Sequence, residues 1–324
     1  MPTAPSLARI KPAALQSGDI VGIVAPASDL KPDLLEAGCD NLRRLGYKPF
    51  YLKSILDRDL YFAGSVERRT RELEEMFVRD EVRAILCARG GYGSNYLLDR
   101  IDLKKIKAHP KIFVGYSDLT SLLTYFADQA GLVTFQGPMV SKDFAHADGV
   151  DLVSWECALH GGSEWTLPPD SEVKSLVEGT AEGVLYGGCL SILVASLGTP
   201  YEIRTAGTIL FIEDIAAKPY QIDRMLMQLK LAGKLADVQA IIFGEMVDCF
   251  QNKNQGYTLE DVVLRVVGDL GVPVAYGLRS GHVSRANITL PIGVRAALKV
   301  SSSGVELKML EASTATAVSS KSVG

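Results

Sequence analysis

The sequence predicts an α/β protein in which a doubly wound parallel sheet is followed by a smaller, β-rich body. Two observations support this prediction. In the first half, short continuous apolar runs alternate with segments of helical periodicity. In the second half, short strands are frequent and helices are few. Ligands of doubly wound sheets bind beyond the carboxyl ends of the strands, so we look for functional residues there.

The first half contains the alternation that favours a doubly wound sheet. An apolar run occupies residues 19–28, and leucines at helical spacing follow over residues 30–45 and end at Gly46. Further strands are expected at residues 47–52, 84–88, 111–115 and 132–135, and further helices at 66–78 and 119–127. Strands that are covered on both faces account for the continuous apolar character of these runs.

The second half reads as a smaller α+β or barrel-like body. Residues 182–191 form a strand that passes through a glycine pair into a short helix. Other strands are expected at 207–214, 238–243, 288–290, 294–298 and 305–309, the last three closing the second domain, and helices at 220–231 and 259–270.

We therefore expect four segments along the chain. An amino-terminal α/β domain occupies residues 1–165, and a linker rich in Gly, Pro and Ser occupies residues 166–178. A β-rich carboxyl-terminal domain occupies residues 179–311, and a disordered tail of small polar residues occupies 312–324.

Composition limits the classes of function. The chain has 324 residues, a net charge of −4 and no basic patch, so neither nucleic acid nor a membrane surface is an expected partner. No apolar run reaches the about 18 residues of a membrane span, and the start lacks a signal-peptide core, so we expect a cytoplasmic protein. The five cysteines are scattered without a C-x-x-C pair, so no disulfide framework, metal site or other cofactor is indicated.

Ser117 stands on a bend between a strand and a helix. The strand turns sharply at Gly115, and the helix begins near Asp118. This geometry exposes a serine hydroxyl at the carboxyl end of a sheet beside the amide of Asp118, as in an activated nucleophile with an oxyanion donor. The alternative is that Ser117 only caps the helix.

A glycine-rich loop, Arg89-Gly-Gly-Tyr-Gly-Ser94, follows the neighbouring strand. It is open to three interpretations: a tight turn, a phosphate-binding loop, or a loop that faces a substrate through Arg89, Gly90, Gly91 and Tyr92. The phosphate-binding interpretation is weak because the loop lacks both the G-x-G-x-x-G spacing and the G-K-[ST] ending. The substrate-facing interpretation rests on its expected position at the same sheet edge as Ser117.

His282 is the candidate general base among the four histidines. It lies beside Gly281 in a polar stretch just before a strand, where loops often carry function, whereas the other three read as surface residues. Glu213 stands at the exit of the clearest strand in the second half and is the candidate carboxylate, with Asp214 as the alternative. The order Ser, Glu, His is also used by α/β-hydrolases, but their G-x-S-x-G pattern is absent.

These motifs together resemble the LD-carboxypeptidase family of serine peptidases, which act in murein tetrapeptide recycling and have microcin-immunity peptidases as relatives. The similarity runs from about residue 19 to about residue 298. It rests on Arg89-Gly-Gly-Tyr-Gly93, Gly115-Tyr-Ser-Asp118, Tyr186-Gly-Gly188 with Leu197-Gly-Thr-Pro-Tyr201, Phe211-Ile-Glu-Asp214 and Gly281-His282. One departure is Cys189, which stands where many members have Asn and cannot offer its amide hydrogen bonds.

The resemblance implies a flavodoxin-like first domain, a smaller β-rich second domain and a site between them. It implies that Ser117 is the nucleophile, His282 the base and Glu213 the residue that orients the base. The amide of Asp118 and one from the Gly90–Gly91 turn would form the oxyanion hole. Family members are typically homodimers that need no metal.

The expected reaction is hydrolysis of an L,D-peptide bond with release of the carboxyl-terminal D-Ala of murein tetrapeptide through an acyl-enzyme. Arg89 or an amide of the glycine-rich loop is expected to bind the terminal carboxylate. Two alternatives stay open: a microcin-type aminoacyl-nucleotide peptidase, and a non-catalytic protein that binds a small ligand.

Overall fold

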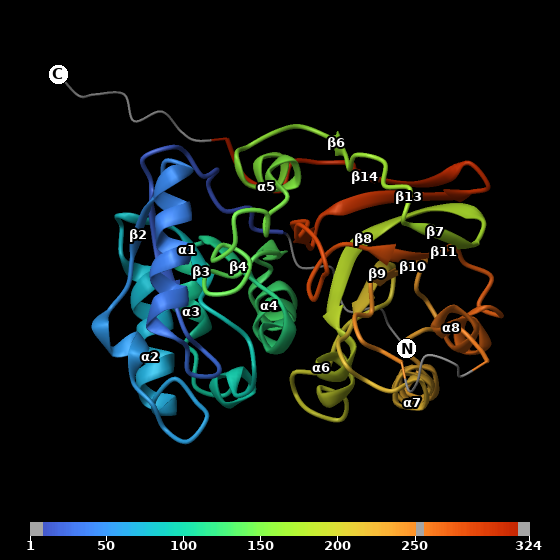
Figure 1. Cartoon of the computed structure of the whole chain (residues 1–324), viewed down its shortest axis with the longest axis horizontal. Coiled ribbons are helices and arrows are strands. Elements are labelled where there is room, and N and C mark those ends of the chain that lie inside the picture. Colours follow the sequence, from blue (N-terminus) through green and yellow to red (C-terminus); the bar gives the residue numbers. More distant parts are fainter. Residues whose placement is uncertain (1–8, 251–255, 317–324) are drawn as a thin grey trace.

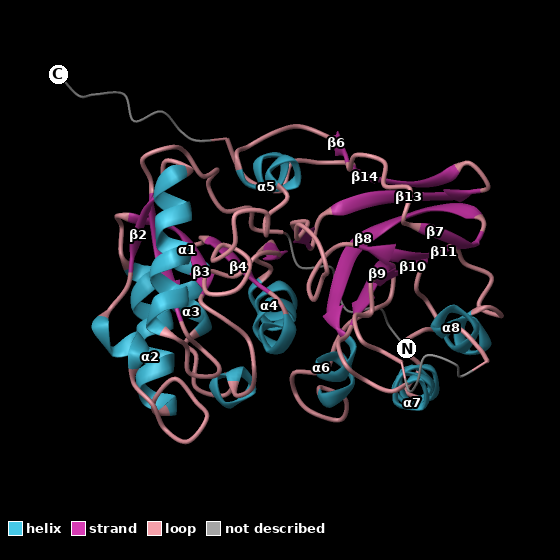
Figure 2. Ribbon diagram, in the orientation of Figure 1, coloured by secondary structure: helices cyan, strands magenta, loops and turns pink. Residues whose placement is uncertain are grey.

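The chain folds into two lobes that lie side by side, each built on its own β-sheet (Figure 1). The computed structural model describes residues 9–250 and 256–316. Helices pack on both sheets, and the amino-terminal lobe carries the larger share of them (Figure 2). Within the described ranges, no helix has the length and apolar character needed to cross a membrane.

The amino-terminal lobe contains a six-stranded sheet. Its order across the sheet is β2 (Lys48–Phe50), β1 (Ile20–Val24), β3 (Val82–Cys87), β4 (Ile112–Gly115), β5 (Thr134–Gln136) and β12 (Leu290–Ile292). The first five strands are parallel, and their order 2-1-3-4-5 is that of a flavodoxin-like doubly wound sheet, which confirms the predicted fold. The sixth strand, β12, is antiparallel to β5.

Alternate residues of the central strands enter different apolar clusters because both faces of the sheet are covered. Leu86 of β3 packs in a cluster with residues of α1 and α5, whereas Ile85 packs in a cluster with residues of α2, α3 and α4. This arrangement explains the continuous apolar runs of the sequence. The helices are α1 (Pro32–Arg44), α2 (Val66–Val78), α3 (Leu103–Ala108), α4 (Thr120–Tyr125) and α5 (Leu152–Leu159), with 3₁₀ turns η1 (Lys53–Leu56), η2 (Ser94–Leu97) and η3 (Ser117–Leu119) and a π turn η4 (Phe126–Ala130).

The carboxyl-terminal lobe contains an eight-stranded mixed sheet. Its order is β6 (Trp165–Thr166), β14 (Gly304–Met309), β13 (Arg295–Ser301), β8 (Gly179–Cys189), β9 (Thr208–Glu213), β10 (Ala240–Gly244), β11 (Val274–Leu278) and β7 (Lys174–Val177). The four strands from β8 to β11 are parallel. Ser175 of β7 donates a hydrogen bond to the carbonyl of Ser301 in β13 at 2.6 Å, so the sheet curls toward a barrel. Helices α6 (Leu190–Ala195), α7 (Pro219–Leu231) and α8 (Leu259–Val267) lie on one side of it (Figure 1).

Three sequence-based expectations differ from the structure. The strand expected at 288–290 to close the second domain is β12 (Leu290–Ile292), which joins the first sheet instead, because its buried Leu290 and Ile292 complete the edge beside β5. The expected linker at 166–178 includes β7, which pairs with β11 and packs Leu176 against the apolar cluster of α7 and α8. A linker assignment from polar composition missed this short edge strand.

The expected tail also begins later than predicted. The hydroxyl of Ser313 donates a hydrogen bond to the carbonyl of Ala158, and Ala315 donates one from its amide to the carbonyl of Pro12 at 2.8 Å. Small polar residues can therefore be ordered when their hydrogen bonds are made inside the protein. Residues 317–324 of the expected tail lie outside the described residues, and the division into domains stays a prediction.

The lobes are joined by a buried hydrogen bond. Tyr186 of β8 donates from its hydroxyl to Oδ2 of Asp128 in the π turn after α4 at 2.6 Å. Helix α4 lies between the first sheet and β8 (Figure 1). Burial raises the pKa of Asp128 from 3.8 to about 6, so the folded protein holds this proton to a higher pH than the unfolded chain does.

We expect Asp128→Asn to change how stability depends on pH. The raised pKa makes folding less favourable as the pH rises from about 4 to about 6, by up to about 3 kcal/mol. Asn keeps an acceptor for Tyr186 but does not ionise. The free energy of unfolding of the variant, measured with urea, should therefore rise relative to that of wild type between pH ~4 and pH ~7. Exposed Asp148→Asn is the control. Equal pH dependence of wild type and Asp128→Asn would contradict the expectation.

Candidate active site

Ser117 lies on a strained bend between β4 and α4. Its φ angle is 64°, in the left-handed region that non-glycine residues rarely adopt. It is the only partly exposed residue in the stretch 111–120. Neither η3 nor α4 is capped by a side chain, so the capping alternative finds no support. A strained, accessible serine between a strand and a helix has the geometry of a nucleophile elbow.

The glycine-rich loop that follows β3 lies against this serine. A Cβ atom on Gly90 would stand 2.9 Å from the Cβ and 3.1 Å from the Oγ of Ser117. Only glycine therefore allows the backbone this close to the hydroxyl. The next residues turn through Gly91, whose φ is 106°, and Tyr92 donates its amide to the Oγ of Ser28 at 3.1 Å. The structure thus brings Gly90 to Ser117, whereas Gly91 faces Ser28.

Two buried side chains hold this loop in place. Asp118 accepts a hydrogen bond from the amide of Ser94 at 2.8 Å, which connects the serine bend to the end of the loop. Arg69 of α2 donates from Nη1 to the carbonyls of Pro26 and Gly93 at 2.6 and 2.7 Å. The sequence did not identify Arg69, because an arginine in a charged helix reads as a solvent-facing residue.

Arg89 and Tyr92, the other loop residues singled out by the sequence, face outward. Arg89 donates from Nη1 to the carbonyl of Asp29 at 2.9 Å. The Tyr92 side chain is 43% exposed, and its ring lies 6.1 Å from that of Tyr61 and 6.0 Å from that of Tyr96, measured between centroids.

His282 and Glu213 form a buried pair in the carboxyl-terminal lobe. Glu213 is the last residue of β9, and His282 lies in the loop after β11. Nδ1 of His282 is 2.7 Å from Oε2 of Glu213, and the backbone amide of His282 donates to the same oxygen at 3.1 Å. When Nδ1 carries the proton and donates it to the carboxylate, Nε2 is left as the basic nitrogen.

Asp214 does not contact this histidine. Its two carboxylate oxygens accept the amides of Ser191 and Ile215, each at 2.8 Å. Burial raises the pKa of Asp214 above its ordinary value. Asp214 therefore holds the start of α6, and Glu213 is the carboxylate placed beside His282.

Tyr116 links the serine to the histidine across the lobe boundary. Its ring meets the His282 ring edge-on, with centroids 5.2 Å apart and an interplanar angle of 87°. Tyr116 precedes Ser117 directly, so the bend and the Glu213–His282 pair lie in the same region. The Tyr116 hydroxyl donates to Oδ1 of Asp143 at 3.5 Å. Burial raises the pKa of Tyr116 well above the ordinary value, so this side chain stays neutral.

Gln136, which the sequence did not single out, lies beside the buried pair. It is fully buried at the end of β5, and both polar atoms of its amide lack a hydrogen-bond partner in the described structure. Oε1 of Glu213 also lacks one. A Cβ on Gly281 would stand 2.6 Å from Cδ of Glu213 and 2.8 Å from Nε2 of Gln136, so both groups flank the same point. Unpaired buried polar atoms are rare and often mark functional sites.

Cys189 has no features of a nucleophile. It is buried, and its amide donates to Oγ1 of Thr120 at 3.0 Å. Burial, with a contribution from the nearby Glu213 carboxylate, raises the pKa of its thiol well above the ordinary value. The reactive thiolate form is therefore disfavoured.

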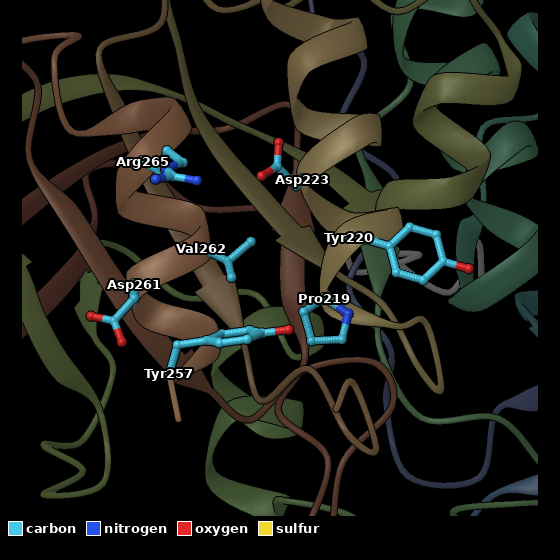
Figure 3. Close-up of a pocket in the computed structure, with 7 residues that line it drawn as sticks. All are labelled: Pro219, Tyr220, Asp223, Tyr257, Asp261, Val262 and Arg265. Atoms are coloured by element: carbon cyan, nitrogen blue, oxygen red, sulfur yellow. The ribbon is translucent and has the colours of Figure 1, made fainter. Parts of the chain in front are cut away.

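Two open cavities differ in their relation to this region. One, of about 540 Å³, is lined in part by the residues that follow His282 in the chain. Its lining consists of Lys142, Asp143, His146–Gly149 and Val283–Ala286. The other, of about 410 Å³, lies at α7 and α8 and includes none of the predicted site residues (Figure 3). Among the described residues, no cluster of three or more His, Cys, Asp and Glu side chains could hold a metal ion.

Comparison with known proteins gives matches to both lobes. The family model for the LD-carboxypeptidase N-terminal domain matches residues 21–137, and the model for the LD-carboxypeptidase C-terminal domain matches residues 182–298. A Bacillus subtilis protein named "Probable murein peptide carboxypeptidase" is 43% identical over 291 residues, which cover 89% of this chain and 91% of that protein.

Two solved structures have the same fold. The muramoyltetrapeptide carboxypeptidase from Oxalobacter formigenes matches with a TM-score of 0.81 and 30% identity, over 90% of this chain and 99% of that one. The microcin C7 self-immunity protein MccF, known from Escherichia coli, matches with a TM-score of 0.87 and 27% identity, over 94% of this chain and 100% of that one. The likeness therefore extends over both lobes.

We expect Gly281→Ala to break the contact between Glu213 and His282. The added Cβ would collide with the Glu213 carboxyl group, in addition to the strain of a φ of 92°. The low-field proton NMR resonance of the His282 Nδ1–H should therefore disappear. Gly271→Ala is the matched control, because Gly271 has a φ of 70° but open space around its Cβ position. Both variants should lose about 1–3 kcal/mol of stability, and a retained resonance in Gly281→Ala would refute the expectation.

Proposed function

This chain belongs to the LD-carboxypeptidase family, and on that premise we propose that it releases the carboxyl-terminal D-Ala of murein tetrapeptide by hydrolysing an L,D-peptide bond. The observation that carries the proposal is the buried contact between His282 and Glu213 beside the strained bend at Ser117. The names of the murein-acting relatives support the substrate class.

In the proposed mechanism, Ser117, His282 and Glu213 act as nucleophile, base and orienting carboxylate. Nε2 of His282 takes the proton of the Ser117 hydroxyl while Oγ attacks the carbonyl carbon of the scissile bond. Glu213 holds the ring through Nδ1 and stabilises the imidazolium that forms. The 2.7 Å distance between Nδ1 and Oε2 supports this assignment.

The oxyanion of the tetrahedral intermediate is assigned to backbone amides beside Ser117. We assign the amide of Asp118 and one amide of the Gly90–Gly91 turn. The close approach of Gly90 to Ser117 supports the second assignment. The imidazolium then gives its proton to the leaving nitrogen, D-Ala departs, and a water activated by His282 hydrolyses the acyl-enzyme to restore Ser117.

A second candidate is cleavage of an aminoacyl nucleotide by the same chemistry. The TM-score of 0.87 to the microcin self-immunity protein favours it. Parallel assays with a murein tetrapeptide and an aminoacyl-sulfamoyl adenosine separate the two. Preferred turnover of the second compound would replace the murein proposal and keep the mechanism.

A cytoplasmic location and a homodimeric state belong to the same proposal. Recycling of murein peptides places their hydrolysis inside the cell, and light scattering of the purified protein measures its assembly state directly.

We expect Ser117→Ala and His282→Ala each to lower the release of D-Ala by a factor of ~10⁶, since triad residues act as a unit. The measurement is free D-Ala produced from the tetrapeptide that contains meso-diaminopimelate. His109→Ala changes a histidine at the end of α3 that makes no contact with Ser117, His282 or Glu213 in the described structure, and it should keep the wild-type rate.

Labelling by a fluorophosphonate at Ser117 separates an enzyme from a passive binding protein. An activated serine reacts, and Ser117→Ala should lose the label. Wild-type turnover in a folded Ser117→Ala protein would refute the mechanism.

A further inference from the structure

The cavity of about 540 Å³ is lined by residues that include Val283, which follows His282 in the chain. One wall is the loop Val283–Ala286, and the opposite wall is the segment Lys142–Gly149 after β5. The first wall belongs to the loop after β11, which also carries His282. The second wall follows β5, the strand that pairs with β4. The cavity therefore opens at the lobe boundary next to the region of Ser117 and His282.

The charged groups of this cavity differ in their availability. Arg285 is shared between two carboxylates, with Nη2 3.4 Å from Asp170 and 3.6 Å from Glu245. Asp143 points into the protein, where it accepts the amide of Met139 at 2.8 Å. Lys142, in contrast, is exposed and makes no ion pair within the described part of the chain. Of the two Lys and Arg side chains in the lining, Lys142 is thus the one that can pair with an anion of a ligand.

Lys142 also lies close to the predicted catalytic groups. Its Nζ stands 5.9 Å from the centre of the Tyr116 ring, and the His282 ring is 5.2 Å from the same ring. The aromatic face holds an ammonium group by a cation–π interaction. Arg89, the cation expected from the sequence, instead donates to the carbonyl of Asp29.

An exopeptidase needs a cation within reach of the carboxylate that follows the scissile bond, and Lys142 packs over the ring of Tyr116, the residue before Ser117. In a substrate that loses one residue, the terminal carboxylate lies about 3.5 Å along the chain from the scissile carbonyl. A charge-assisted hydrogen bond adds about 2.8 Å. The cation that reads this carboxylate must therefore lie about 6 Å from the point of attack, on the side of the leaving group.

We propose that Lys142, rather than Arg89, binds the terminal carboxylate of the substrate in this cavity and so selects peptides with a free carboxyl end. The inference rests on the proposed function and names the residue that gives it exopeptidase specificity. The ammonium forms an ion pair with the carboxylate of the D-residue while Ser117 attacks the preceding carbonyl. After cleavage the free amino acid leaves through the open mouth of the cavity.

The test compares two substrates that differ in one charge: the murein tetrapeptide ending in D-Ala, and the same peptide ending in D-Ala carboxamide. Release of D-Ala or of its amide is measured as kcat/KM for wild type, Lys142→Met and Arg89→Met. Wild type should prefer the acid by a factor of about 10–100, as expected for a hydrogen-bonded charge pair. In Lys142→Met, kcat/KM should fall by this factor for the acid and stay unchanged for the amide. Lys142→Arg should keep part of the preference for the acid.

Each result decides the matter. A preference for the acid that survives in Lys142→Met, or that is lost in Arg89→Met, overturns the inference. An equal loss on both substrates assigns Lys142 a structural role and also overturns it. Loss of activity in Lys142→Met on peptides that contain diaminopimelate, with activity kept on peptides that contain L-Lys at the same position, is a further outcome. That result would show that Lys142 binds the side chain of this residue instead of the terminal carboxylate, and it would overturn the inference. Failure of wild type to cleave either peptide would refute the proposed function itself.

Discussion

The contact between His282 and Glu213 is the interaction on which the candidate site depends. Glu213 is fully buried, and a carboxylate in such a place is costly unless hydrogen bonds compensate it. His282 provides two of them, from its backbone amide and from its ring, to the same oxygen. The pair thus fixes the ring orientation and satisfies Oε2 of the carboxylate, whereas Oε1 has no hydrogen-bond partner among the described residues. Gly281 is required beside it because any Cβ there would enter the carboxyl group.

The serine comes from the other lobe, so the site exists only while the lobes keep their relative position. Buried contacts between the lobes maintain it: Tyr186 bonds to Asp128, and Cys189 bonds to Thr120 at the start of the helix after Ser117. Strand β12 adds a link of a different kind, because this segment from the second half pairs with β5 and completes the first sheet. It lies a few residues after His282, which ties the histidine loop to the sheet that carries Ser117.

Local patterns in the sequence were enough to predict much of this structure. The helix at Val66–Val78 was located to the residue, and the bend at Ser117 followed from the change from strand to helix. The recognition of the family, now confirmed, rests on motifs that each occupy a few residues. Features that depend on how the lobes dock were missed: the partner of β12, the unpaired amide of Gln136 and the ammonium of Lys142. No local periodicity reports which residues from distant segments will face one another.

The lining of the cavity beside His282 bears on which of the two proposed substrates fits. Both leave a negatively charged group on the far side of the scissile bond, so Lys142 alone does not discriminate between them. A nucleotide also needs a surface on which its base can stack, and such surfaces are aromatic or planar cationic side chains. The lining holds no Phe, Tyr or Trp, and its guanidinium, Arg285, is shared between two carboxylates. The one planar aromatic ring of the lining is the small imidazole of His146, so the cavity offers a charged contact to a small leaving group and only a limited surface to a base, which favours an amino acid on this side of the site.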